Sequence, residues 1–256
     1  MIKFKNIQAT YTTVRGTVTA VDNVTLEVPQ GITLGIAGES GCGKSTLLKV
    51  IYGDITSPLA LERGLIEYGF WDKNRRVVTS ENIRDHWFKG ISYIPQSSMS
   101  SLNPVVRIRK QFVDFLDPES DKAQVLEEVR AYIQKLDLPP EAIDAYPHQL
   151  SGGMRQRIMV AMGTFFRPDI ILADEPTTAL DVVVQKGILL LLMDIQEEMK
   201  NNIFFISNLV NQIGYERAFP NAPQARYEKP GFVRLICPRH DFFKISIFLL
   251  YLKRRD

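Results

Sequence analysis

The sequence predicts an α/β protein, a doubly wound layer sandwich of parallel strands and helices that carries a helical insertion. Two observations indicate this class. Short apolar runs at 32–38, 90–96 and 170–174 have the composition of buried parallel strands, and segments with helical periodicity follow them. Apolar and polar residues alternate between 2 and 28, with many β-branched side chains, which is typical of antiparallel strands. Strands that alternate with helices indicate a parallel sheet covered by helices.

The N-terminal half begins with two or three short predicted antiparallel strands between Ile2 and Val28. The apolar run 32–38 is broken by glycines and predicts a buried strand, a tight turn and then a helix over about 45–53. Residues 54–90 have an irregular, strand-poor pattern, and we interpret them as a small peripheral β-rich segment.

The C-terminal half begins with a short strand that ends at Gln96. Residues 105–149 are predicted to be helical, above all 121–138, where apolar residues recur at helical spacing and Pro139 and Pro140 end the helix. A helix over 153–166, a buried strand over 170–174, a long helix over 178–200 and a strand over 202–207 follow.

The composition excludes several classes of protein. A chain of 256 residues, 45% apolar and 23% charged, is typical of a globular protein of one domain or two small ones. The net charge of +2 provides no domain-wide basic field for nucleic acid, and two cysteines cannot form a disulfide framework. We therefore expect the reducing cytosol. The sequence has neither the apolar core of a signal peptide nor eighteen consecutive apolar residues, so we expect no membrane span.

Residues 38–46 match the pattern G-x-x-x-x-G-K-[ST] at a predicted strand-to-helix junction. Glycines allow successive N–H groups to face inward as an anion nest, and the helix N-terminus adds its positive dipole end. Lys44 then reaches the β- and γ-phosphates, and the Ser45 hydroxyl ligates Mg²⁺. Cys42 lies at a variable position and is assigned no redox or metal role. The predicted nucleotide-binding residues are Gly38, Glu39, Ser40, Gly41, Cys42, Gly43, Lys44, Ser45 and Thr46.

The apolar run 170–173 ends in two adjacent carboxylates, Asp174 and Glu175. A buried strand would deliver them to the carboxyl edge of a parallel sheet, where the phosphate loop also lies. Asp174 is expected to hold Mg²⁺ through its water shell, and Glu175 to orient or deprotonate the attacking water. Without the phosphate loop upstream, a strand end facing solvent would be the better interpretation.

Residues 150–157 read Leu-Ser-Gly-Gly-Met-Arg-Gln-Arg, and Ser151 lies 23 residues before Asp174. A Ser-Gly-Gly turn at a helix start is a second phosphate nest, and one chain has no use for two nests on one triphosphate. Together with the phosphate loop and the Asp-Glu strand, this octet resembles the signature of ATP-binding-cassette ATPases. The resemblance implies a P-loop NTPase layer sandwich with an antiparallel β subdomain and a helical (signature) subdomain. It also implies a head-to-tail dimer around two ATP molecules, each contacted by the partner subunit's nest, here Ser151, Gly152 and Gly153.

Further positions match the family pattern singly. Tyr11, 27 residues before Gly38, resembles the aromatic residue that stacks on adenine, although a surface tyrosine on an edge strand is an alternative. Gln96 resembles the glutamine that touches Mg²⁺ and whose loop senses the membrane partner. Asp181 ends a loop, 176–181, that resembles the one contacting the opposite subunit.

Three segments, 97–108, 146–157 and 173–182, together resemble the ATPase subunits of oligopeptide and dipeptide importers, a group that includes nickel and some oligosaccharide importers. The resemblance implies a peripheral protein on the cytoplasmic face of the cell membrane. Its implied partners are a second ABC ATPase in a homodimer or heterodimer, transmembrane permease subunits and, indirectly, an extracellular solute-binding protein, but no nucleic acid. We expect an ABC ATPase domain over 1–207, with its helical subdomain at about 97–165, and an atypical tail over 208–256.

The resemblance stops at Asn208, where the family pattern has a histidine that contacts the γ-phosphate. Asparagine donates a neutral hydrogen bond but carries no charge, so we expect poorer stabilisation of the transferring phosphoryl group. Residues 1–207 carry 22 basic and 25 acidic residues, a net of −3, whereas 208–256 carry 9 and 4, a net of +5. Composition and motif therefore change at the same place.

The tail has three interpretations. A reading-frame artefact beginning near Ser207 is favoured, and a genuine C-terminus of an impaired or regulatory ATPase is the second. In the third, the apolar stretch 242–255 with its basic end lies on a membrane surface or the transporter, although a packed strand or disordered end is simpler.

Two other functions remain open for the chain as a whole. One is an inactive subunit that pairs with an active homologue. The other is a non-transport ATPase of the same superfamily, which is disfavoured because Lys44 and Asp174 are only 130 residues apart, without sustained heptads.

Overall fold

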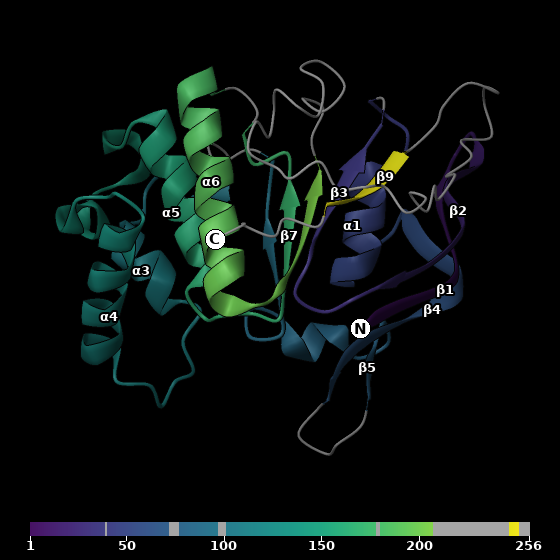
Figure 1. Ribbon diagram of the computed structural model, residues 1–256, viewed down its shortest axis with the longest axis horizontal. Coiled ribbons are helices and arrows are strands. Elements are labelled where there is room, and N and C mark those ends of the chain that lie inside the picture. Colours follow the sequence, from purple (N-terminus) through teal and green to yellow (C-terminus); the bar gives the residue numbers. More distant parts are fainter. Residues whose placement is uncertain (39, 72–76, 97–100, 178–179, 207–245, 251–256) are drawn as a thin grey trace. The chain divides into compact units, whose positions relative to one another are not determined.

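The structure is a computed structural model of the chain, and it describes residues 1–38, 40–71, 77–96, 101–177, 180–206 and 246–250 (Figure 1). These residues form two compact units. Of the described residues, unit 1 comprises those of Met1–Trp87 and those from Lys200 onward, and unit 2 comprises those of Phe88–Met199.

Unit 1 contains an antiparallel sheet of four strands in the order β2-β1-β4-β5. The strands are β1 (Ile2–Thr13), β2 (Gly16–Val28), β4 (Leu59–Trp71) and β5 (Val77–Thr79). β1 pairs with β2 from Ile2 opposite Val28 to Thr13 opposite Gly16, so the predicted antiparallel strands are confirmed as one long hairpin. Burial of alternate apolar side chains on β1, such as Ile2 and Phe4, forms the core of this sheet.

The interpretation of 54–90 as a β-rich segment is confirmed, although its pattern was described as strand-poor and β4 alone spans 13 residues. Two glycines with positive φ, Gly64 at 99° and Gly69 at 75°, interrupt its alternating pattern. A Cβ on Gly64 would lie 2.6 Å from the carbonyl oxygen of Asn6 on β1, and the pairing of β1 with β4 shifts register beside it. Such irregularities break the period-two signal on which strand prediction depends.

Unit 1 also holds the strand that leads to the phosphate loop. β3 (Thr33–Ala37) pairs in parallel with β8 (Asn202–Ile206) and antiparallel with β9 (Ser246–Leu250). α1 (Lys44–Tyr52) follows β3 and contacts β2 and β8 (Figure 1), and a 3₁₀ turn, η1, covers Ile83–His86. Because Ser246–Leu250 is a strand, the packed-strand interpretation is favoured over the membrane-surface one for this part of the tail.

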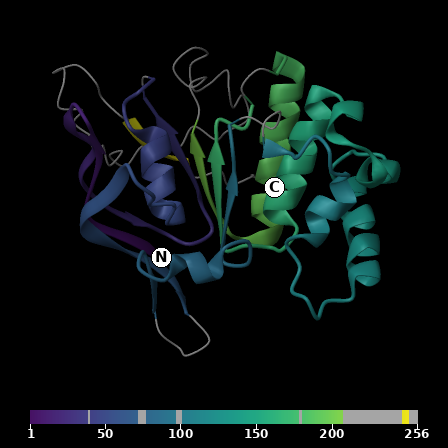
Figure 2. The same cartoon turned by 180° about the vertical axis from the view of Figure 1, so that it is seen from behind.

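Unit 2 is mainly helical around two parallel strands, β6 (Ile91–Ile94) and β7 (Ile170–Asp174). Its helices are α3 (Ile108–Val113), α4 (Lys122–Lys135), α5 (Gly152–Thr164) and α6 (Val182–Met199), with 3₁₀ turns η2 (Pro140–Asp144) and η3 (Pro147–Gln149). The Asp121 carboxylate caps α4 by accepting from two backbone N–H groups. α5 packs against both β6 and α6 (Figure 2). The predicted helical character of 105–149 is confirmed, because α3, α4, η2 and η3 lie within that segment.

Within the part of the chain that the structure describes, no helix has the length and apolar composition needed to cross a bilayer.

Gly163 of α5 lies directly against β6. A Cβ at this position would meet Cγ1 of Ile94 at 2.7 Å, which is closer than carbon atoms pack. We expect Gly163→Ala to lower the free energy of unfolding by about 1–2 kcal/mol, because overpacking outweighs the better helix propensity of alanine. Urea denaturation measures this, with Gly187→Ala of α6 as the control. There the nearest atom, Nη2 of Arg157, is 3.6 Å away, so a neutral or stabilising change is expected. An equal loss of unfolding free energy in Gly163→Ala and Gly187→Ala would contradict the packing argument.

Candidate nucleotide site

The phosphate loop of unit 1 joins β3 to α1 and has the backbone that an anion nest requires. Gly41 and Gly43 have φ values of 80° and 100°, in the left-handed region that favours glycine. A Cβ on Gly43 would lie 2.2 Å from the carbonyl oxygen of Ala20, whereas the space beside Gly41 is open. Position 43 therefore needs glycine, because any side chain would clash with the carbonyl oxygen of Ala20. The open space beside Gly41 leaves room for a ligand.

Lys44, the first residue of α1, is 5% exposed and its Nζ donates to the carbonyl oxygen of Gly38 at 2.8 Å. The ammonium group is thus held inside the loop by the backbone carbonyl oxygen of the first loop residue, Gly38. An anion in the loop would provide a stronger acceptor for the same group. Glu39 lies outside the described residues.

Cys42 lies in the same loop and is buried at 4% exposure. Burial raises the pKa of the Cys42 thiol above its usual range, although the neighbouring Lys44 ammonium opposes this shift. A thiol with a raised pKa is a poor nucleophile and metal ligand at neutral pH, which agrees with assigning Cys42 no redox or metal role.

Tyr11 lies on β1, which is flanked by β2 and β4 and is therefore not an edge strand. Its hydroxyl is 3.3 Å from Oγ1 of Thr46, in the first turn of α1. Tyr11 is thus anchored beside the phosphate loop, where an aromatic ring could contact the base of a bound nucleotide. Its stacking on adenine stays a prediction.

In unit 2, the end of β7 presents the two predicted carboxylates in different settings. Asp174 is 3% exposed and its Oδ2 accepts a hydrogen bond from the Tyr93 hydroxyl at 2.7 Å. Glu175 has φ of 46°, a left-handed conformation that is uncommon for a residue other than glycine. Its Oε2 accepts from Nε2 of Gln96 at 2.9 Å, so residues 79 positions apart meet.

Sequence reasoning selected Gln96, Asp174 and Glu175 but missed Tyr93. The available signal was the position of Tyr93 near the end of a short apolar strand that was predicted to lie in the same parallel sheet as 170–174. Only the observed pairing of β6 with β7, with Tyr93 opposite Leu172, shows that the tyrosine reaches the carboxylate.

The signature residues begin α5. Ser151 is the N-cap, and its Oγ accepts from the backbone N–H of Met154 at 3.2 Å. Gly152 and Gly153 form the first turn, and a Cβ on Gly153 would lie 3.1 Å from Cγ1 of Val184 on α6. The exposed Asp181 carboxylate caps α6 by accepting from the N–H groups of the next turn, at 3.0 and 3.1 Å. These contacts explain the local structure, and the contacts of these residues with nucleotide stay predictions.

The predicted site residues are divided between the units. Tyr11 and the phosphate loop belong to unit 1, whereas Gln96, Ser151, Asp174, Glu175 and Asp181 belong to unit 2. Their union in one site therefore stays a prediction, and Asn208 lies outside the described residues.

The chemistry of the donor groups fits Mg²⁺. The described residues contain no cluster of three or more His, Cys, Asp or Glu side chains that could hold a metal ion by themselves. Mg²⁺ usually keeps several waters and binds through one or two protein oxygens plus substrate phosphates. The oxygens of Ser45, Gln96 and Asp174 are of the hard type that this ion prefers.

A glycine-rich loop between a parallel strand and a helix, with a buried lysine, defines a nucleotide-binding α/β protein. The family model described as ABC transporter matches residues 21–178. The chain therefore belongs to the ABC transporter family, and ATP is the nucleotide that this family binds.

The sequence is also similar to curated members of this family. The chain is 36% identical over 217 residues to the oligopeptide transport ATP-binding protein OppD of Escherichia coli K12, covering 81% of this chain and 62% of the relative. It is 35% identical over 212 residues to the dipeptide transport ATP-binding protein DppD of Bacillus subtilis 168, with 81% and 63% covered. The chain thus spans less than two thirds of the length of these curated relatives.

Solved structures share the fold. The dimeric bacterial ABC transporter cassette MJ0796 covers 82% of this chain and 89% of its own, at 27% identity and a TM-score of 0.64. A second structure of MJ0796, a post-hydrolysis dimer bound to ADP and Pi, has a TM-score of 0.61 with the same coverage and identity. The predicted α/β P-loop NTPase class is confirmed.

Proposed function

We propose that the chain is the ATP-binding and ATP-hydrolysing subunit of an importer for oligopeptides or dipeptides, which dimerises around ATP to drive a membrane permease. The observation that carries this proposal is the buried Lys44 ammonium inside a left-handed glycine loop at the start of α1. The identities of 35–36% to peptide-importer subunits support the cargo class.

Different residues carry out different parts of the proposed ATP hydrolysis. The N–H groups of 38–46 and the Lys44 ammonium hold the phosphates, and Tyr11 supports the adenine. Mg²⁺, held through the oxygens of Ser45, Gln96 and Asp174, would neutralise charge on the phosphate oxygens. Glu175 orients the attacking water and accepts its proton, so that the water oxygen attacks the γ-phosphorus and ADP leaves.

Gln96 links this chemistry to the loop that follows it. Its Nε2 donates to Glu175, so a movement of the loop after Gln96 would move the proposed base as well. This connection supports the proposal that a permease contacting the loop controls hydrolysis.

Dimerisation completes the proposed site. Ser151, Gly152, Gly153 and Asp181 would contact the nucleotide held by a second copy or a homologous ATPase, so that ATP favours the closed dimer. The permease places the subunit at the cytoplasmic face of the cell membrane, and an extracellular solute-binding protein acts indirectly. We propose an ATPase domain over 1–207, with a helical subdomain at about 97–165, and an atypical tail over 208–256.

The proposal is tested by adding Mg·ATP to the purified chain and measuring phosphate release and molar mass by light scattering. Hydrolysis and ATP-dependent dimerisation are expected, and co-purified permease should alter the rate. Absence of both phosphate release and ATP-dependent dimerisation would refute it.

Asn208 gives a separate prediction about the hydrolysis rate. We expect Asn208→His to raise ATP turnover about ten-fold, because a histidine can carry positive charge toward the γ-phosphate where asparagine cannot. Phosphate release under saturating Mg·ATP measures this, with Asn211→His as the matched control. If the unaltered chain turns over as fast as the variant, Asn208 does not limit hydrolysis.

The same position motivates a second candidate function. An inactive or regulatory subunit would bind ATP and hydrolyse it only in a heterodimer with an active ATPase. Assays with and without such a partner distinguish this function from the first.

A further inference from the structure

Tyr93 connects the two parallel strands of unit 2 at the end where the carboxylates lie. The register places Tyr93 opposite Leu172 and Ile94 opposite Ala173, the residue before Asp174. From this position the Tyr93 hydroxyl donates to Oδ2 of Asp174 at 2.7 Å, within the range of a strong hydrogen bond to a carboxylate.

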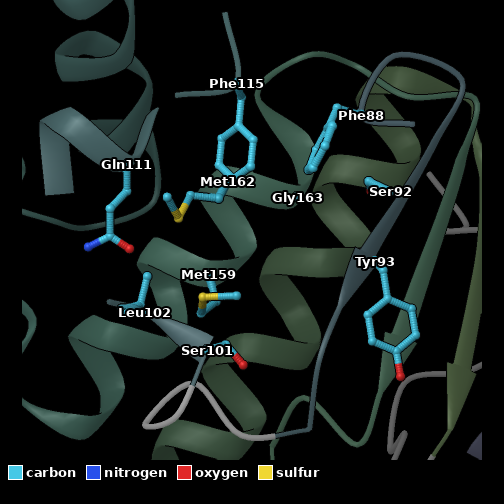
Figure 3. Close-up of a pocket in the computed structure, with 10 residues that line it drawn as sticks. All are labelled: Phe88, Ser92, Tyr93, Ser101, Leu102, Gln111, Phe115, Met159, Met162 and Gly163. Atoms are coloured by element: carbon cyan, nitrogen blue, oxygen red, sulfur yellow. The ribbon is translucent and has the colours of Figure 1, made fainter. Parts of the chain in front are cut away.

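The Tyr93 side chain points away from α5. Ile94 and Ser92 face α5, since both lie beside the position that a Cβ on Gly163 would occupy. Successive residues of a strand point to opposite faces, so Tyr93 points away from α5. Figure 3 shows Tyr93 at the edge of a pocket that it lines with Met159 and Met162, with its hydroxyl turned away from both methionines.

Asp174 needs such a partner because its carboxylate is almost completely buried. A buried carboxylate without hydrogen bonds is costly, and one that can rotate presents its oxygens to a ligand in several directions. A hydroxyl that donates to one oxygen fixes the plane of the group and determines where the other oxygen points. Groups that hold a metal-binding side chain in this way commonly change metal affinity when they are removed.

We propose that Tyr93 is a positioning residue for Mg²⁺: its hydroxyl orients the Asp174 carboxylate toward the ion that accompanies ATP. This inference rests on the proposed function, in which Asp174 holds Mg²⁺. Tyr93 itself touches neither the nucleotide nor the ion, and it acts through Asp174.

The test is the Mg²⁺ requirement of nucleotide binding in Tyr93→Phe, which removes the hydroxyl and keeps the ring. Binding of a fluorescent ATP analogue is titrated with Mg²⁺, and binding without divalent ions is measured in EDTA. We expect about ten-fold more Mg²⁺ for half-saturation, whereas the affinity in EDTA is unchanged. Tyr93→Leu, which also removes the ring, should show at least the same shift.

Tyr132→Phe is the matched control, because the Tyr132 hydroxyl is 2.8 Å from Oγ1 of Thr164 in the same unit. It removes a comparable hydrogen bond and should leave the Mg²⁺ requirement unchanged. Melting curves of all variants show whether they are folded. An equal loss of affinity with and without Mg²⁺ in Tyr93→Phe would mean a merely structural role and would overturn the inference.

Asp174→Asn separates this inference from the proposed function. If Asp174→Asn raises the Mg²⁺ requirement and Tyr93→Phe does not, the positioning role is wrong and the proposed function stands. If Asp174→Asn has no effect, Asp174 does not hold the ion, and both the metal assignment and the role of Tyr93 are overturned.

Discussion

Lys44→Ala is expected to reduce ATP hydrolysis by at least about a hundred-fold and to weaken nucleotide binding. The Lys44 ammonium is nearly buried within the glycine loop, 2.8 Å from the carbonyl oxygen of Gly38, and the proposed mechanism places it on the β- and γ-phosphates. Alanine leaves the nest of N–H groups but removes the positive charge that opposes the developing charge of the transferring phosphoryl group.

Phosphate release and equilibrium binding of a fluorescent ATP analogue measure these two effects. Lys49→Ala is the matched control, because Lys49 lies on the same helix, is exposed and should change neither quantity. Melting temperatures of both variants separate a loss of chemistry from a loss of folding. Unchanged turnover in a folded Lys44→Ala protein would remove the phosphate-loop assignment.

Glu175→Gln is expected to retain ATP binding and to lose hydrolysis by about 10²- to 10⁴-fold, the usual contribution of a general base. Glutamine keeps the size of the side chain but cannot accept the proton of the attacking water. The left-handed backbone at Glu175, with φ of 46°, and the contact with Gln96 determine where this group points. A glutamine amide oxygen can still accept from Gln96, so the local geometry should persist.

Two measurements check this prediction. Single-turnover phosphate release should be nearly abolished, and light scattering should show a stable ATP-bound dimer, because the nucleotide that holds it closed is no longer consumed. Glu197→Gln, an exposed position on α6, is the control and should behave as the unaltered chain. Fast hydrolysis by Glu175→Gln would show that another group serves as the base.

Much of the fold could be predicted because its signals are local. The strand before the phosphate loop, the strand 170–174 and the helices of unit 2 follow from apolar runs and helical spacing in short windows. The length of β4 was not predicted, because Gly64 and Gly69 adopt positive φ and the register shifts beside Gly64 in the pairing with β1 and across Gly69 in the pairing with β5. A bulge of this kind depends on the neighbouring strand, which a window of sequence does not contain.

Part of the candidate site could likewise be predicted from local sequence. Within nine residues, the loop 38–46 specifies its own glycines, lysine and hydroxyl groups, so the sequence alone predicts a phosphate site. The spacing of 150–157 before Asp174 and Glu175 further identified the family. Those inferences needed no tertiary contacts because each motif is a short run of adjacent residues, and the order and spacing of the motifs are read along the chain.

By itself, then, the sequence determined the class of protein and predicted the nucleotide loop and the two carboxylates. Only the tertiary structure decided that Tyr93 holds Asp174 and that Gln96 holds Glu175, pairs that are 81 and 79 residues apart. The physical reason is the parallel register of β6 and β7. A shift of one residue would turn Tyr93 to the opposite face, and no local preference of either strand specifies that register.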